Sequence, residues 1–220
     1  MQNACVFDLD GTLINSLKDL AISSNYALEV QGFPTHETEE YRYFVGRGAQ
    51  KLIEDILPEA IRTPEIIKKT RELFNDHYDA HYLDNTAPYD GISQLLAQLK
   101  QRGFRLAVVS NKPDDFVKKI VTQLFGGSFD AVIGQREDVA RKPDPASVFE
   151  ACEAMGIEPQ GCLYLGDSGV DMLTAKAAGM FPIGVLWGFR DRAELLENGA
   201  RALIEHPSEI LALIGTALAL

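Results

Sequence analysis

The stretch ACVFDLDGTL, at residues 4–13, sets the pattern that the rest of the chain follows. Its first four residues are apolar without alternation, which is typical of a short strand buried on both faces of a sheet. Asp8 and Asp10 follow at once, and Gly11 lets the backbone turn. Paired carboxylates at a strand end can bind a divalent cation, or divide nucleophilic and acid–base roles between them. The competing interpretation is an ordinary turn with two solvated aspartates.

Similar apolar runs recur along the chain, and each ends in a polar or glycine-containing turn. They lie at residues 106–109, 131–133, 162–165 and 183–186. Segments with apolar residues at helical spacing alternate with them, at residues 92–100, 116–125, 145–155 and 170–178. Strand alternating with helix predicts an α/β fold, with a Rossmann-like parallel sheet covered by helices on both faces.

One long segment interrupts this alternation. Residues 16–85 have helical periodicity and little strand character, with candidate helices at 17–30, 49–57 and 64–82. An insertion of roughly 70 residues far exceeds an ordinary strand-to-helix connection. We therefore predict a small helical cap domain at 16–85, inserted into a catalytic core made of residues 1–15 and 86–220. Ligands of open α/β sheets bind at the carboxyl ends of the strands, so the insert would cover the site.

The composition limits the partners of the protein. The chain has 220 residues, 46% of them hydrophobic, and a net charge of -11. An acidic surface repels nucleic acid and anionic lipid, so we expect neither as a partner. The apolar run at 210–220 is too short for a membrane span, and we expect a docked helix there. Three scattered cysteines and no visible signal peptide favour the cytoplasm, and we expect a monomer or homodimer.

A second set of polar residues follows the predicted strand at 106–109. Ser110, Asn111 and Lys112 offer a hydroxyl, an amide and an ammonium group at the same sheet edge as the aspartate pair. Such donors can hold an oxyanion, with the N–H groups of the next helix nearby. An ordinary helix cap is the alternative, because serine and asparagine favour helix starts.

Two more motifs follow the later strands. Lys142 stands in RKPDP, where the two prolines that follow it stiffen the loop that would hold the ammonium group. Asp167 and Asp171 stand in GDSGVD, and capping or the helix dipole can explain either one singly. Capping does not explain four acids gathered at one sheet edge, since they would repel one another without a cation. Ligand sets made only of oxygen favour Mg²⁺ over zinc.

The order of these motifs resembles that of the haloacid dehalogenase-like superfamily of phosphotransferases: an acid pair, a hydroxyl, a lysine and a second acid pair. The resemblance covers nearly the whole chain, including an inserted cap of the C1 type. Within the superfamily the chain is most similar to phosphoglycolate phosphatases and related small-molecule phosphatases. Three further segments carry this similarity, namely VGRG at 45–48, PYDG at 88–91 and LWGF at 186–189.

The resemblance implies a role for each motif in a Mg²⁺-dependent phosphatase. Asp8 would be the nucleophile that forms an aspartyl-phosphate, and Asp10 the acid that protonates the leaving oxygen and then the base that activates water. Asp8, the Asp10 backbone carbonyl and Asp167 would hold Mg²⁺, with Asp171 supporting its water shell. The expected substrate-binding residues are Thr12, Arg47, Ser110, Asn111 and Lys142.

The substrate depends on the cap. Arg47 lies between two glycines and could reach the site and pair with a substrate carboxylate, as a small phosphorylated acid such as phosphoglycolate would offer. A solvated surface arginine is the competing interpretation. Many relatives have an aspartate where this chain has Asn15, which leaves the details of cap and substrate open. His77 and His81 have metal-ligand spacing, but packing is the favoured interpretation.

Several other activities stay open. A β-phosphoglucomutase-like phosphomutase uses the same core, and a pyrophosphatase or a sugar-phosphate phosphatase would share the motifs. A phospho-acceptor signalling module also phosphorylates an aspartate beside Mg²⁺, but there the aspartate follows a middle strand and no large cap covers it. Asp10 favours phosphate-ester chemistry, because relatives that dehalogenate or cleave phosphonates typically lack this acid.

Overall fold

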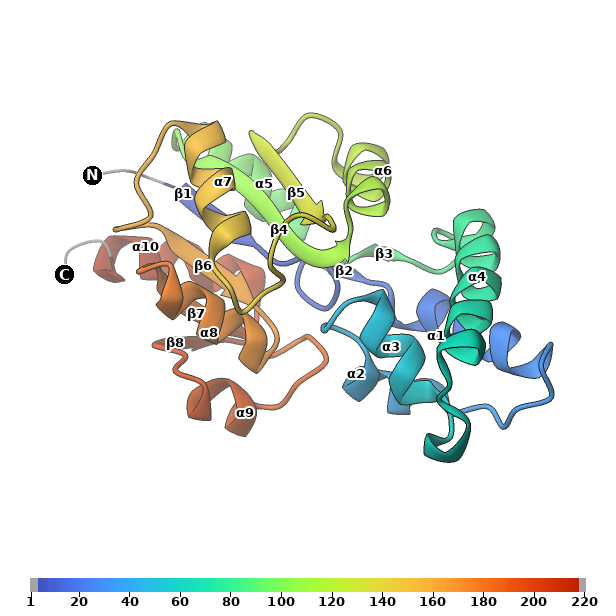
Figure 1. The fold of residues 1–220 in the computed structure, drawn as a ribbon. Helices are drawn as coiled ribbons and strands as arrows, with labels where there is room; N and C mark the ends of the chain where they lie inside the picture. The colour runs from blue at the N-terminus through green and yellow to red at the C-terminus, as the bar shows by residue number, and fades with distance from the viewer. Residues whose placement is uncertain (1–3, 218–220) are drawn as a thin grey trace.

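The computed structural model describes residues 4–217, which form an α/β core and a group of helices joined to it by a narrow ribbon (Figure 1). The core contains a six-stranded, fully parallel sheet in the order β5-β4-β1-β6-β7-β8. Its strands are β1 (Ala4–Phe7), β4 (Arg105–Pro113), β5 (Ala131–Gln135), β6 (Leu163–Gly166), β7 (Phe181–Val185) and β8 (Ala202–Ile204). The first strand lies in the middle, so both its neighbours bring their carboxyl ends close to Asp8.

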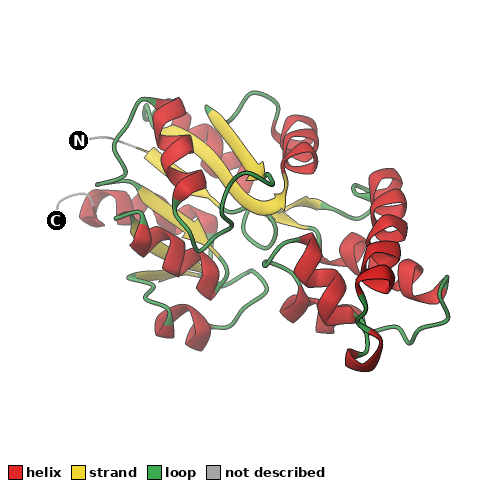
Figure 2. Cartoon of the chain, in the orientation of Figure 1, coloured by secondary structure: helices red, strands yellow, loops and turns green. Residues whose placement is uncertain are grey.

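Helices cover both faces of this sheet (Figure 2). Cys5 and Phe7 of β1 belong to a hydrophobic cluster with α5, α6 and α10, whereas Ala4 and Val6 belong to a second cluster that includes α7 and α8. Successive strand residues point to opposite faces, so an uninterrupted apolar strand needs a helix layer on each side. The helices of the core are α5 (Ile92–Gln101), α6 (Asp114–Phe125), α7 (Ala146–Met155), α8 (Gly169–Ala177), α9 (Arg192–Glu197) and α10 (Ile210–Ala217).

The inserted helices form a separate layer with a hydrophobic cluster of their own. Leu28, Ile53 and Tyr78 are among its fully buried members. The helices are α1 (Leu17–Glu29), α2 (Tyr41–Phe44), α3 (Ala49–Ile56) and α4 (Pro64–His81), with short 3-10 turns at Thr38–Glu40 and Glu59–Ile61. Antiparallel strands β2 (Ile14–Asn15) and β3 (Ala87–Pro88) form the ribbon that carries this layer. The ribbon adjoins the domain boundaries expected at residues 16 and 85, which stay a prediction.

The expected α/β class and its parallel sheet with two helix layers are confirmed. The helix expected from the apolar run at 210–220 is present as α10, and residues 218–220 lie outside the described residues. Sequence patterns did not predict β8 and α9, which have three and six residues and offer too short a window for periodicity. Strand β4 extends past its apolar run through Pro113, with an irregular register between Val109 and Pro113. Within residues 4–217 no helix combines the length and apolar character that crossing a membrane requires.

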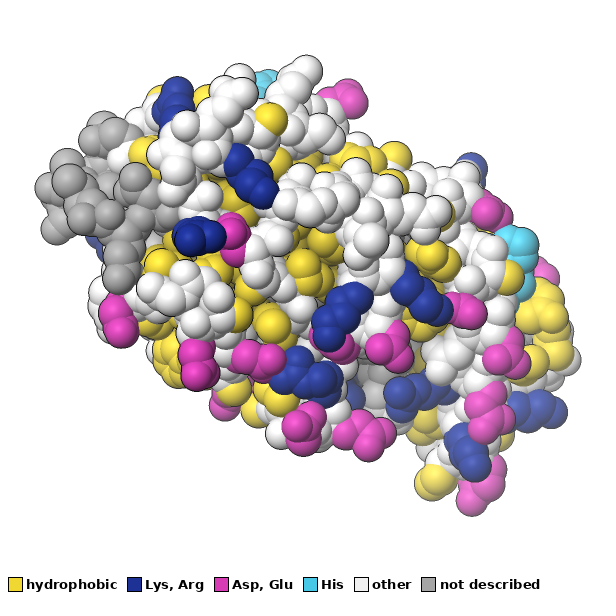
Figure 3. Space-filling view, turned by 90° about the horizontal axis from the view of Figure 1, so that it is seen from above, with side chains coloured by type: hydrophobic (Ala, Val, Ile, Leu, Met, Phe, Trp, Pro, Cys, Tyr) yellow, Lys and Arg dark blue, Asp and Glu magenta, His cyan; other side chains and the backbone are white. Residues whose placement is uncertain are grey.

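The acidic excess of the chain is not gathered into one patch on the face shown in Figure 3. Acidic and basic side chains are interspersed there, with apolar side chains between them. This face therefore offers a charged partner no surface patch of a single sign.

Candidate active site

The four sequence motifs meet at the carboxyl edge of the sheet. Asp8 follows β1, Ser110 lies in the last part of β4, Lys142 lies in the loop after β5, and Asp167 follows β6. All four side chains are buried. Parallel strands place their carboxyl ends at one edge, so residues more than a hundred positions apart become neighbours there.

Lys142 connects two of the acids. Its Nζ atom lies 2.8 Å from Asp8 Oδ1 and 2.8 Å from Asp171 Oδ1, and it donates to the Val109 carbonyl at 3.1 Å. Burial opposes the charge on Lys142, but Asp171 and Asp8 outweigh it and hold the pKa of the ammonium group well above its usual value. The lysine therefore remains a fixed cation beside the expected nucleophile.

Three buried carboxylates offer a site for a metal ion. Oxygen atoms of Asp8, Asp167 and Asp171 all lie within 4.8 Å of one another. Burial raises the pKa of Asp8 to about 7, and the charge of Asp171 adds to this while Lys142 opposes it. Burial and both neighbouring acids also raise the pKa of Asp167. One lysine cannot neutralise three such acids, so the group fits a divalent cation, and its oxygen ligands suit Mg²⁺.

The backbone holds Asp167 tightly in place. Its Oδ2 atom accepts a 2.7 Å hydrogen bond from the Phe189 N–H group. Gly11 has a φ of +87° and Gly188 lies on the other side; a Cβ atom on either glycine would come within 2.2 Å of Asp167 atoms. The two glycines thus let the backbone approach the carboxylate more closely than any side chain would allow.

Asp10 is held between the core and the start of the cap. The Ser16 hydroxyl donates to its Oδ1 at 2.5 Å, and Lys112 Nζ lies 3.1 and 3.2 Å from its two carboxylate oxygens. Ser16 directly precedes α1, so this bond links the expected acid–base residue to the first cap helix. Asp10 is not one of the three carboxylates grouped as potential metal ligands among the described residues, and its expected contact to metal through the backbone carbonyl stays a prediction.

The other expected substrate-binding residues differ in their placement. Ser110, Asn111 and Lys112 line a cavity between cap and core. The Asn111 side chain is already engaged, since it donates to the Gly46 and Lys142 carbonyls and accepts from the Lys142 N–H group. Thr12 is fully buried outside this lining, and its hydroxyl has no hydrogen-bond partner among the described residues. The structure therefore does not bring the Thr12 side chain to the cavity.

Arg47 points away from the cavity. Its guanidinium group lies 2.7 Å from Asp55 Oδ2 and donates to the Tyr43 carbonyl at 3.2 Å. It borders a separate surface hollow with Arg190. The flanking Gly46 and Gly48 do line the cavity, so the loop approaches the site while its arginine does not.

Several contacts that hold the cap against the core come from residues that the sequence did not single out. Arg42 donates to the Gly188 and Phe189 carbonyls, at 2.6 and 3.3 Å, and Arg190 donates to the Val45 carbonyl at 3.0 Å. Phe189 belongs to the hydrophobic cluster of the cap although it comes from the core. Arginines are so common on protein surfaces that the sequence alone could not identify Arg42 and Arg190 as contacts between cap and core.

His77 and His81 lie one turn apart on α4. Their rings stack at 4.4 Å, His77 Nδ1 lies 3.0 Å from the Ser23 hydroxyl, and His81 Nδ1 lies 2.8 Å from Asp84. Neither belongs to a group of three potential metal ligands within the described residues.

Comparisons with known proteins identify related chains. The family model for haloacid dehalogenase-like hydrolases matches residues 5–185. A phosphoglycolate phosphatase from Aquifex aeolicus is 36% identical over 185 residues, 84% of each chain. One from Haemophilus influenzae is 33% identical over 216 residues, covering 94% of this chain and 96% of that protein. The crystal structure of a protein proposed to be a phosphoglycolate phosphatase, from Lactobacillus delbrueckii, superimposes with a TM-score of 0.91 at 32% identity, over 97% of this chain and 99% of that one.

Proposed function

Because this chain belongs to the haloacid dehalogenase-like hydrolase family, and within it is a phosphatase of phosphoric monoesters, we propose that its site hydrolyses phosphoglycolate with Mg²⁺ through an aspartyl-phosphate. The observation that carries the proposal is the position of Asp8. Its carboxylate lines the cavity, lies 2.8 Å from a buried lysine and belongs to the group of three acids. We choose phosphoglycolate as the substrate because the relatives described above are named phosphoglycolate phosphatases.

In the first step a carboxylate oxygen of Asp8 attacks phosphorus, the bond from phosphorus to the ester oxygen breaks, and Asp10 gives its proton to that leaving oxygen. In the second step Asp10 takes a proton from water, whose oxygen attacks phosphorus and releases phosphate from Asp8. The covalent intermediate divides one difficult hydrolysis into two displacements. Asp10 is held by Ser16 and Lys112 beside the cavity, where both proton transfers would occur.

Each remaining residue would stabilise charge or geometry. Lys142 would neutralise the phosphoryl oxygens, since its ammonium group already lies beside Asp8. Ser110 would donate to a phosphate oxygen, because its hydroxyl lines the same cavity. Asp8, Asp167 and the Asp10 backbone carbonyl would hold Mg²⁺, with Asp171 next to them. Bound there, the ion supplies positive charge that allows a phosphate to approach the carboxylates.

The cellular setting is part of the proposal. Cys5, Cys152 and Cys162 are buried and free, which supports a reducing compartment such as the cytoplasm. A monomer or a homodimer remains our expectation for the assembly.

A panel of phosphate esters tests the reaction. Free phosphate would be measured with Mg²⁺ from phosphoglycolate, sugar phosphates, nucleotides and pyrophosphate. We expect release from phosphoglycolate at the highest kcat/KM. An isomerised sugar phosphate without net phosphate release would indicate a mutase instead, and no release from any ester by folded, Mg²⁺-loaded protein would refute the phosphatase assignment.

A further inference from the structure

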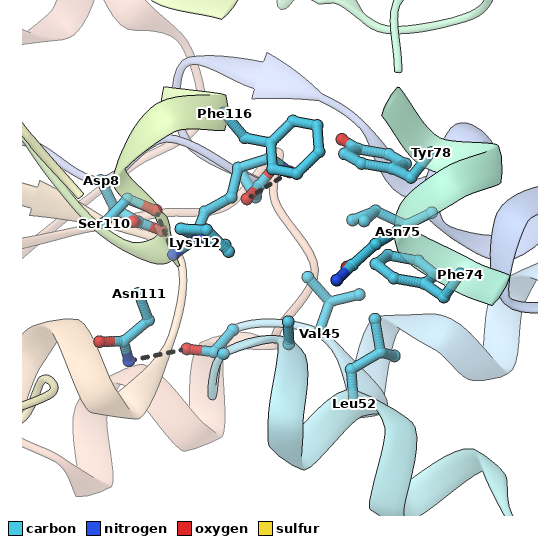
Figure 4. Close-up of a pocket in the computed structure, with 16 residues that line it drawn as sticks. Asp8, Val45, Leu52, Phe74, Asn75, Tyr78, Ser110, Asn111, Lys112 and Phe116 are labelled. Carbon is cyan, nitrogen blue, oxygen red and sulfur yellow. Dashed lines mark hydrogen bonds and ion pairs between the residues drawn. The ribbon is translucent and has the colours of Figure 1, made fainter. Parts of the chain in front are cut away.

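The cap side of the cavity is mostly apolar and carries no charged side chain among the residues that the structure describes there. Its lining from the cap is Leu20, Val45, Gly46, Gly48, Ala49, Leu52, Phe74, Asn75 and Tyr78. Only Asn75 and Tyr78 offer side-chain polar atoms. Among the cap side chains that line the cavity, only these two, both on α4, can therefore form hydrogen bonds to a leaving group (Figure 4).

The Tyr78 hydroxyl is a buried polar group without a partner. The side chain is 1% exposed, and its oxygen has no hydrogen bond among the described residues. Its ring is fixed by stacking on Phe74 at 5.4 Å and by contact with Phe116 at 5.2 Å. A buried hydroxyl left unpaired is costly, and such groups are normally satisfied by protein, water or a ligand.

Asn75 is the second unpaired group. Within residues 4–217 its side-chain amide has no hydrogen bond, and Figure 4 shows it extending from α4 toward the middle of the cavity. Residues three and four apart lie on one face of a helix, so Asn75 and Tyr78 point to the same side. Burial raises the pKa of Tyr78 to about 12, so its hydroxyl is protonated and able to donate.

Lys112 supplies the positive charge at this end of the cavity. Its ammonium group lies 4.7 Å from the centre of the Tyr78 ring, and it is the one cation among the described lining residues. A hydroxyl, an amide and an ammonium group together provide hydrogen-bond donors for a ligand that has only hydrogen-bond acceptors. A carboxylate is such a ligand, and it can be buried only where donors and a cation meet it.

We propose that Tyr78 and Asn75, with Lys112 beside them, bind the carboxylate of the leaving group, so that the substrate is a short phosphorylated 2-hydroxy acid. This inference rests on the proposed function, because it assigns the far end of the same substrate. It replaces Arg47 in that role, since the Arg47 guanidinium group is occupied by Asp55 outside the cavity.

Binding of two inert analogues tests the proposal without turnover. The first, 3-phosphonopropionate, copies phosphoglycolate with a methylene group in place of the ester oxygen, and the second, propylphosphonate, replaces its carboxylate by a methyl group. Calorimetry on the Mg²⁺-loaded protein should show that the first binds about tenfold or more tightly than the second, as expected for hydrogen bonds to a charged group.

Matched variants identify the residues responsible. Tyr78→Phe keeps the stacked ring. It should reduce the ratio of the affinities for 3-phosphonopropionate and propylphosphonate by about tenfold, while the affinity for propylphosphonate stays unchanged. Asn75→Leu, of similar size, should also reduce the preference. Tyr82→Phe is the control, because the Tyr82 hydroxyl bonds Gln123 outside the cavity, and it should change neither affinity.

Three results would overturn the inference. The first is equal affinity of the wild-type protein for the two analogues, and the second is a loss of affinity for both analogues in Y78F. The third is a preference for 3-phosphonopropionate that persists in both the Tyr78 and the Asn75 variant but is lost in Arg47→Ala. Circular dichroism would establish that each variant is folded. Failure of the proposed function is a different result, namely tight binding of 3-phosphonopropionate without phosphate release from any ester.

Discussion

At the residue scale, the chemistry of the site depends on how few cations face its acids. Lys142 contacts Asp8 and Asp171 together, whereas Asp167 accepts a hydrogen bond from the Phe189 N–H group and is stabilised more weakly by the charge of Arg190. Buried carboxylates this close raise one another's pKa and destabilise the folded state when ionised. A bound cation would relieve this repulsion, and substitution of a single acid would relieve part of it.

Asp8→Asn should abolish turnover without weakening the fold. The amide cannot form the aspartyl-phosphate, so kcat should fall by at least about a thousandfold. Because the pKa of Asp8 is raised to about 7, its ionised form is unfavourable in the folded protein, and Lys142 keeps Asp171 as a partner. We therefore expect equal or higher thermal stability, measured by a melting curve in EDTA beside a phosphate-release assay. Residual turnover near the wild-type rate would refute the nucleophile assignment.

Mg²⁺ should stabilise the folded protein by an amount that depends on Asp167. A ligand that binds only the folded state, present at a concentration of about a hundred times its Kd, adds about 2.7 kcal/mol to the free energy of unfolding. Urea denaturation with Mg²⁺ or with EDTA measures this difference. Asp167→Asn should remove most of it, whereas Asp79→Asn, on the surface opposite Lys119, should not. An equal response of all three proteins would contradict the metal site.

At the scale of elements, a single carboxylate joins the two ends of the inserted segment. Asp19, in the first turn of α1, accepts hydrogen bonds from the N–H groups of Asn85 and Thr86 and from their side chains. These residues immediately precede β3. Asp19 thus fixes the return of the chain from the cap against its departure, next to the ribbon that connects cap and core.

Asp19→Asn should destabilise the protein by about 2–3 kcal/mol at neutral pH, because the new amide group would face donors. Burial opposes ionisation of Asp19, but the bonds from Thr86 and Asn85 outweigh it and hold its pKa below the usual value. The stabilisation is therefore present above about pH 5 and is lost as the pH falls through the folded-state pKa. Urea denaturation at several pH values should show the gap between wild type and D19N narrowing in acid; a gap that widens there would be inconsistent with this anchor.

The sequence predicted most elements of the core, with β8 and α9 as exceptions, and the acids at the strand ends, because both depend on local pattern. An apolar run followed by Asp8 or Asp167 marks a strand and its carboxyl end without knowledge of the partners. Patterns could not predict which face of α4 meets the cavity. They therefore gave no sign that the Tyr78 ring packs within the cap while its hydroxyl has no hydrogen-bond partner among the described residues. They also favoured Arg47 as a substrate ligand, because its pairing with Asp55 arises only after the cap helices pack.

At the scale of the whole molecule, cap and core meet in a closed arrangement around the cavity. The segment after β7 contacts both the cap and the loop that contains Asp167. Phe189 packs into the hydrophobic cluster of the cap, its N–H group holds Asp167, and its carbonyl accepts from Arg42. The position of the cap and that of Asp167, an expected metal ligand, are therefore linked through Phe189.

Arg42→Ala should loosen the cap. Loss of two hydrogen bonds to the 188–189 backbone removes a contact that only the closed arrangement makes, so the open form should become more populated. We expect a larger radius of gyration in small-angle scattering and a KM raised by about tenfold, the order of one hydrogen bond to a charged group. Arg71→Ala is the control, because Arg71 bonds only Gln50 within the cap. Identical scattering from R42A and the wild-type protein would contradict this role of Arg42.

Gly11 and Gly188 leave no room for a side chain on either side of Asp167, and this limits how the protein can vary. Neither residue carries a reactive group, yet even alanine would displace the carboxylate by its first carbon atom. In a library covering every single substitution, these two positions should tolerate as few replacements as the acids themselves. An engineer who wishes to alter the selectivity of this protein has freedom in the cap wall, and almost none in the two loops that enclose Asp167.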